Sequence, residues 1–245
     1  LLNILLTWGS KSLRVNDLRQ ALYDAGAILM DKVLVNLHGK EHQMRRKVEA
    51  KILKPNFFRW YENEVFQKTL GETITPYLKE GKADLVDLAY RILLNLTADF
   101  SGIDRPKKSF DETERILSML RTFGKAATLG QAKGDKDAIS NQIKNSLEEF
   151  KTEFFNPSKQ KRLEYLKRFK LGEVNEDDLP KDILTELLRN QEKLGLSDNI
   201  ILKETAFYLL AGAFTSIHTL THAMHEIFER IRDPIEESKV MRDPI

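Results

Sequence analysis

Apolar residues recur at steps of three and four along most of the chain, which is the spacing of one face of an α-helix. The alternation of apolar and polar positions that marks strands is nearly absent. Breaks fall at stretches rich in Pro, Gly and Asp, among them 101–109 and 156–158. The pattern predicts a mainly α fold with helices at 16–34, 40–54, 58–80, 83–100, 110–128, 135–155, 159–170, 178–194 and 199–231.

The last predicted helix carries apolar side chains along one face and unusually small side chains along another. A second face steps by four through Phe207, Ala211, Thr215 and Thr219 beside Gly212, so its side chains shrink to a methyl and then to a hydroxyl. Since Gly costs roughly 1 kcal/mol relative to Ala inside a helix, this notch predicts close approach by another helix or by a ligand. The Thr215 hydroxyl is expected to bond back to the Ala211 carbonyl. The core face carries Leu202, Ala206, Leu209, Ala213, Ile217, Leu220, Met224 and Ile227.

Composition narrows the class of protein. With 245 residues, 41% hydrophobic and 31% charged, the chain can bury a sizeable core, and we expect one domain over 1–245. The net charge of +2 gives no sign of a nucleic-acid partner. The absence of cysteine excludes disulfides and thiolate ligands and fits a reducing compartment, so we predict a cytoplasmic protein. The opening LLNILLTW is too short to span a bilayer, which needs about 20 apolar residues, and no transmembrane segment is expected.

A second stretch, HGKEHQMRRKVEAKIL at 38–53, places two cationic donors on one helix face. His42 and Arg46 are four residues apart, so their side chains lie about 6 Å apart along the axis and can reach one anionic ligand edge together. Arg45 and two lysines flank them. The alternative is a solvated basic helix.

The two stretches together resemble the cytochrome P-450 family, the haem-thiolate monooxygenases. Ala211-Gly212-Ala213-Phe214-Thr215-Ser216 matches five of the six positions of that family's Ala/Gly-Gly-x-Asp/Glu-Thr-Thr/Ser helix motif. His42-Gln43-Met44-Arg45-Arg46 fits its His/Trp-x-x-x-Arg motif, at the expected distance upstream. The segment DLPKDILTELLRN at 178–190 is similar to the family's approach to the long helix. The resemblance covers most of this chain and about the middle half of a full-length member.

The resemblance implies a P-450-like helical fold and a haem cofactor. His42 and Arg46 would meet the haem propionates, while Ala211 and Gly212 would leave room for dioxygen and a small organic substrate. Thr215, with Ser216, would be the catalytic pair, Thr215 bonding the iron-bound oxygen and relaying protons. Phe207, Ala211 and Phe214 would line the substrate pocket. The implied reaction inserts one oxygen atom into an organic substrate, with electrons from NAD(P)H through a ferredoxin or flavin reductase.

Two departures limit what the resemblance implies. Phe214 stands where the family has an acid, so the acid–alcohol pair for proton delivery is half missing. The family's axial cysteine follows the long helix, and this chain reaches Ile245 without any cysteine, so no metal ligand is assigned. We therefore expect a fragment that starts within a gene, stops before the ligand loop and binds haem poorly alone.

Two alternatives come from other classes of protein. His218, His222 and His225, with Glu226 and Glu229 nearby, could offer zinc or non-haem iron ligands from one helix face of a bundle. The same notch could also serve a non-catalytic helical protein that binds a hydrophobic ligand. The basic stretch KQKRLEYLKRFK at 159–170 would attract an acidic ferredoxin, although a solvated helix face explains it as well.

Overall fold

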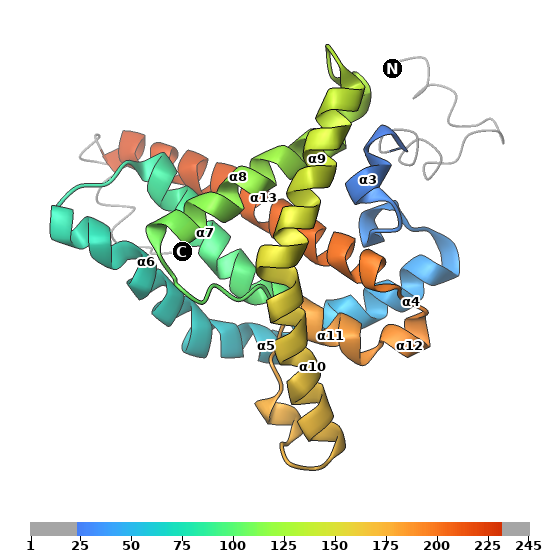
Figure 1. Ribbon diagram of the computed structural model, residues 1–245. Helices are drawn as coiled ribbons and strands as arrows, with labels where there is room; N and C mark the ends of the chain where they lie inside the picture. The colour runs from blue at the N-terminus through green and yellow to red at the C-terminus, as the bar shows by residue number, and fades with distance from the viewer. Residues whose placement is uncertain (1–23, 232–245) are drawn as a thin grey trace, which may run out of the picture.

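The computed structural model describes residues 24–231, and every regular element in that range is helical (Figure 1). This confirms the mainly α class. Short 3₁₀ turns lie at Asp24–Gly26, Leu34–Asn36, Ala50–Leu53, Leu129–Gln131 and Glu176–Asp178, and π-helical turns at Tyr61–Phe66 and Lys151–Phe155. The α-helices are α3 (Ala27–Met30), α4 (Gly39–Glu49), α5 (Pro55–Trp60), α6 (Gln67–Glu80), α7 (Leu85–Ser101), α8 (Phe110–Thr128), α9 (Lys136–Phe150), α10 (Asn156–Lys170), α11 (Ile183–Arg189), α12 (Gln191–Leu194) and α13 (Asp198–Ile231).

Side-chain caps fix the ends of the central helices. The Asp84 carboxylate accepts a hydrogen bond of 2.8 Å from the Asp87 amide and begins α7. Gly102, with φ of 86°, ends α7 in the left-handed conformation that glycine adopts without penalty. Ser109 caps α8 through the Glu112 amide at 3.2 Å. These caps explain why α7 and α8 lie within two residues of their predicted bounds.

The core is built around the pair α7 and α13, which pack along one another. Leu94 and Ala98 of α7 and Ala206, Leu209 and Ala213 of α13 are all fully buried. One hydrophobic cluster connects these positions with residues of α3, α5, α8, α9, α10, α11 and α12. The predicted core face of α13 is buried as far as Ile217, beyond which the helix becomes progressively exposed.

One long helical rod, formed by α9, a π-turn and α10 over residues 136–170, crosses the other helices (Figure 1). The break predicted at 156–158 is wrong, because α9, the π-turn Lys151–Phe155 and α10 follow one another without interruption. Pro157 has no amide hydrogen, and its ring would collide with the carbonyl four residues earlier in a regular α-helix. The π-turn directly before it widens the hydrogen-bond ladder at that point. The rod therefore continues through a proline that normally ends a helix.

Two other predicted helices are shorter in the structure. Between Asp31 and Val33 the chain leaves the helix, with Lys32 in the left-handed region at φ of 59°, so the helix predicted at 16–34 is limited to Ala27–Met30 within the described residues. The helix predicted at 178–194 begins only at Ile183. Pro180 holds the residue before it in an extended conformation, and the Asp182 side chain then caps α11 through the Thr185 amide at 2.7 Å.

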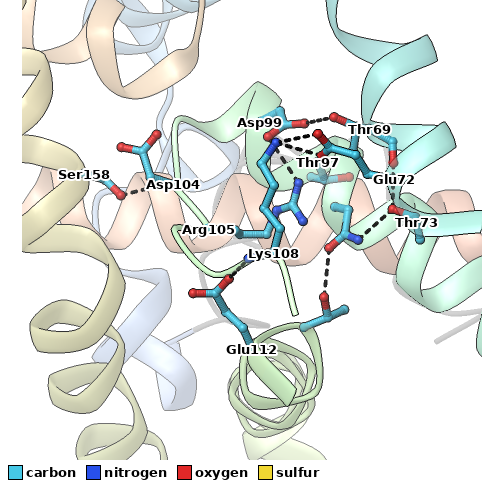
Figure 2. Close-up of polar contacts among 12 residues, drawn as sticks. Thr69, Glu72, Thr73, Thr97, Asp99, Asp104, Arg105, Lys108, Glu112 and Ser158 are labelled. Atoms are coloured by element: carbon cyan, nitrogen blue, oxygen red, sulfur yellow. Dashed lines mark hydrogen bonds and ion pairs between the residues drawn. The ribbon is translucent and has the colours of Figure 1, made fainter. Parts of the chain in front are cut away.

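A polar network fixes the connection between α7 and α8 (Figure 2). Asp99 accepts from the Thr69 hydroxyl at 2.6 Å, which joins α7 to α6. The Glu112 carboxylate accepts from the Lys108 amide at 2.7 Å, and the Lys108 ammonium pairs with Glu72 at 2.7 Å. These bonds hold Lys108 in its left-handed conformation, at φ of 47°. The loop therefore serves as a junction between α6, α7 and α8.

The helix α13 is long and apolar enough to cross a membrane by length and composition alone, over Asp198–Arg230. Core helices of water-soluble proteins meet the same two criteria, and 56% of the most apolar window is buried against the rest of the protein. Length and composition therefore do not decide between the two settings.

Candidate functional site

A pocket of about 420 Å³ lies between α4 and α13. Its walls are mainly apolar and aromatic, and its polar groups come from α4 and from two positions of α13. Five of the residues predicted for cofactor or substrate binding lie in it, although the two segments that supply them are more than 160 positions apart in the sequence. The lining consists of Leu34, Val35, His42, Arg46, Phe100, Glu204, Phe207, Tyr208, Ala211 and Gly212.

The cationic side of the pocket comes from α4. His42 and Arg46 are one helical turn apart, His42 half-buried and Arg46 exposed, and both line the pocket. Neither side chain forms a hydrogen bond or an ion pair with another residue in the range 24–231. Their donors are therefore free to meet an anionic group at the pocket edge.

The opposite wall comes from α13. Phe207, Ala211 and Gly212 line the pocket, and the small side chain of Ala211 lies one turn after the aromatic ring of Phe207. Phe100 of α7 adds a second ring. Because the side chains at Ala211 and Gly212 are small, this wall leaves space in which a flat hydrophobic ligand can lie.

Close packing against α7 accounts for the glycine in this wall. A methyl group added at Gly212 would lie 2.7 Å from Cγ2 of Thr97. The Thr97 hydroxyl donates a hydrogen bond of 2.6 Å to the Leu93 carbonyl, which fixes the orientation of this side chain. Of the two explanations that the sequence left open, helix packing thus requires the glycine. A ligand on the pocket side is compatible with Gly212 and does not by itself require it.

The remaining predicted site residues lie outside the lining of this pocket. The Thr215 hydroxyl donates to the Ala211 carbonyl at 2.7 Å, as predicted, and its side chain is exposed. Ser216 is half-buried beyond the pocket. Phe214 packs edge-to-face on Tyr90 of α7, with ring centroids 5.9 Å apart, so it contributes to packing and does not line this pocket.

A buried cluster of charged groups lies beneath the α4 side of the pocket. Arg45, expected to be a solvated flanking residue, is 1% exposed, and its Nη1 donates to Glu204 Oε2 at 2.7 Å. Glu204 is fully buried and also accepts from the Leu34 amide at 2.8 Å. Glu49 is 1% exposed, and its Oε2 accepts from the Tyr208 hydroxyl at 2.8 Å. The cluster links α4 to α13 behind the pocket wall.

Burial dominates the electrostatics of this cluster. It raises the pKa of Glu49 to about 8, helped by the nearby Glu204 carboxylate and opposed by the Tyr208 hydrogen bond and by Arg45. Burial also raises the pKa of Glu204 to about 6, but Arg45 and the Leu34 amide stabilise its charged form. The pKa of Tyr208 is raised by burial and by the Glu49 carboxylate. Burial thus favours the neutral form of Glu49, whereas Arg45 and the Leu34 amide stabilise the charged form of Glu204.

The sequence carried a weak signal for this cluster. Glu204 lies between core positions Leu202 and Ala206 on the long apolar helix, and Tyr208 follows it by one turn. An acidic residue flanked by core positions needs a buried partner. Nothing in the sequence says which of the 39 Lys and Arg residues supplies it.

The histidine alternative gains no support from the structure. His218, His222 and His225 are exposed, and residues 24–231 contain no group of three His, Asp or Glu that could hold a metal ion.

The basic stretch 159–170 is not simply a solvated helix face. Arg162 is buried and pairs with Asp104 at 2.7 Å and with Asp182 at 2.9 Å.

The residues of the pocket fit one part of a haem group and not another. His42 and Arg46 suit two carboxylates at the pocket edge, and the Ala211 wall suits a flat ring. An axial thiolate has no counterpart, because the 245 residues contain no cysteine. The chemistry of the lining is therefore compatible with a flat ring that carries carboxylates, and this sequence supplies no thiolate ligand for its iron.

Comparison with known proteins adds no independent assignment: no family model and no curated protein matches the chain. The function of the chain is therefore inferred from the pocket and from the sequence motifs that meet in it.

Proposed function

We propose that this chain is the haem-pocket portion of a cytochrome P-450-like monooxygenase that acts on a hydrophobic organic substrate. The observation that supports it most is the meeting of His42, Arg46, Phe207, Ala211 and Gly212 around one pocket. Four of these residues, all except Phe207, come from two motifs far apart in the chain, and a chance resemblance gives no reason for the two motifs to face each other.

In this proposal His42 and Arg46 hold the propionates by charge-assisted hydrogen bonds, which also orient the ring. Ala211 leaves space above the ring, and Phe207 and Phe100 exclude water from its edge. The haem group supplies the oxidative chemistry, the insertion of one atom of dioxygen with electrons from NAD(P)H through a ferredoxin or flavin reductase. None of the 245 residues is a cysteine, so the proposal assigns no thiolate ligand among them, and a cytoplasmic location stays a prediction.

Proton delivery is the weakest part of the proposed machinery. Phe214 is an aromatic packing residue, and the Thr215 hydroxyl is already bonded to the Ala211 carbonyl. Thr215 can still accept a hydrogen bond and, after rotation, donate one, so Thr215 and Ser216 stay candidates for proton transfer.

Metal-free protoporphyrin IX tests the pocket without an iron ligand. We expect the protein to bind it, measured by porphyrin fluorescence, and to bind the dimethyl ester, which lacks free carboxylates, at least tenfold more weakly. Arg46→Ala and His42→Ala should reduce this preference for the free acid. Lys47→Ala is the matched control, because Lys47 is an exposed cation of the same helix that does not line the pocket.

A second candidate function is favoured by one observation. Packing against Thr97 explains Gly212 without a cofactor, so the pocket could serve a helical protein that binds an apolar ligand and has no haem. Equal affinity for protoporphyrin IX and its dimethyl ester, unchanged in Arg46→Ala, would favour this second function and count against the first.

A further inference from the structure

The buried cluster behind the pocket has one positive charge and two carboxyl groups. Arg45 compensates Glu204, which also accepts from a backbone amide. Within residues 24–231, Glu49 accepts from the Tyr208 hydroxyl alone, and its buried Oε1 has no hydrogen-bond partner there. A second buried carboxylate without a cation of its own is strongly disfavoured. The geometry therefore makes Glu49 the group that holds or releases a proton.

The cluster shares its side chains with the pocket. Tyr208 and Glu204 belong to both, and Arg46 lies three residues before Glu49 on α4, one turn away on the same helix. The charged or titratable groups around Glu49 are Arg45 and Arg46 of α4 and Glu204 and Tyr208 of α13. On the side of α11, Glu186 is paired with Lys51 at 3.1 Å, so that pair carries no net charge.

We propose that the pocket takes up a proton when an anionic group binds at His42 and Arg46, and that Glu49 receives this proton. In the free protein the positive charge of Arg46 favours the ionised form of Glu49. An anion on Arg46 cancels this effect and leaves Glu204 as the dominant neighbour of Glu49. The inference rests on the proposed function in one respect only, which is that an anion binds beside Arg46.

The coupling has a definite direction. The free energy of binding and the protonation of Glu49 are linked, so the affinity for an anion decreases as the pH rises through the titration of Glu49. Burial raises the pKa of Glu49 to about 8, which places this decrease on the alkaline side of neutrality. A proton taken up in full would change the affinity by tenfold for each pH unit.

The first experiment needs no ligand. The ¹³C resonance of the Glu49 carboxyl carbon is followed against pH by NMR and assigned with Glu49→Gln. Arg46→Ala removes the charge that an anion would neutralise, so we expect the midpoint of Glu49 to move to higher pH. Lys47→Ala, one position further along the helix and outside the pocket, should leave it in place. An unmoved midpoint in Arg46→Ala would overturn the inference.

The second experiment measures proton uptake on binding of metal-free protoporphyrin IX. Calorimetry at about pH 8 in two buffers of different protonation enthalpy should show greater net uptake in the wild type than in Glu49→Gln, in which only His42 can still gain a proton. Equal uptake in the two proteins would also overturn the inference. If the porphyrin does not bind at all, the proposed function fails, while a midpoint moved by Arg46→Ala would still support the coupling between Arg46 and Glu49.

Discussion

Replacing Glu49 by Gln should make the protein more stable at neutral and alkaline pH. The substitution keeps the shape of the side chain and an oxygen that accepts from Tyr208, and it removes the ionisable group. Burial and the neighbouring Glu204 raise the pKa of Glu49 from 4.5 to about 8 in the folded protein. The folded state therefore holds a proton that the unfolded state releases above pH 4.5.

The sign and size of the effect follow from this difference. Because the folded state binds more protons between the two pKa values, stability is greatest below the unfolded value and falls as the pH rises toward the folded one. The loss is about 1.4 kcal/mol for each pH unit, or about 3 kcal/mol accumulated by pH 7. Glu49→Gln has no such loss, so its advantage over the wild type should be near zero at pH 4.5 and about 3 kcal/mol at pH 7.

Urea denaturation at several pH values between 4.5 and 8 measures this difference directly. Glu62→Gln is the control, because Glu62 is an exposed glutamate away from the cluster. It should follow the wild type within about 0.5 kcal/mol, as surface substitutions do. A constant difference between Glu49→Gln and the wild type across the pH range, or a loss of stability at pH 7, would refute the assignment of a neutral, buried Glu49.

The other predictions concern packing, charge and backbone strain. Gly212→Ala should destabilise the protein by about 1–2 kcal/mol in thermal or urea unfolding, because the added methyl group would meet Thr97 Cγ2. Adding Thr97→Ser should restore the lost stability, and no recovery would contradict the packing explanation. Arg45→Met should cost about 3–5 kcal/mol, since it leaves the buried carboxyl of Glu204 without its cation. Adding Glu204→Gln should recover most of this loss, whereas an additive double variant would argue against the pair. Lys32→Gly should raise the free energy of unfolding by up to about 1 kcal/mol, because φ at this position is 59°, in the left-handed region that glycine adopts without penalty. Lys32→Ala should give no gain in stability. Equal effects of the two substitutions would mean that the backbone is not strained at this position.

Much of the fold follows from the helical periodicity of the sequence, and the failures have local physical causes. The bounds of α8 are those predicted, because Ser109 provides a cap and the apolar positions repeat without a break. At Pro157 a proline normally ends a helix, and no local rule shows that a π-turn will accommodate it. At Pro180 the local rule holds: the residue before the proline is kept out of the helical conformation, and α11 begins only at Ile183.

The candidate site shows the same division between local and tertiary information. Spacing alone placed His42 and Arg46 on one helix face and Ala211 on another, and the fold brings these faces to one pocket. Spacing could not show that Thr97 would occupy the space beside Gly212, or that Arg45 would be buried next to the exposed Arg46. Both outcomes depend on contacts between residues far apart in the chain, namely the packing of α13 against α7 and the polar contacts of α13 with α4.

The most direct test of the central claim is the methyl resonance of Ala211 in a ¹³C-alanine-labelled protein titrated with metal-free protoporphyrin IX. If the ring lies against the α13 wall of the pocket, its ring current should shift the Ala211 methyl upfield in proportion to occupancy. The methyl of Ala213, which is fully buried in the core, should move far less. An Ala211 methyl that stays in place while porphyrin binds would contradict a porphyrin site between α4 and α13.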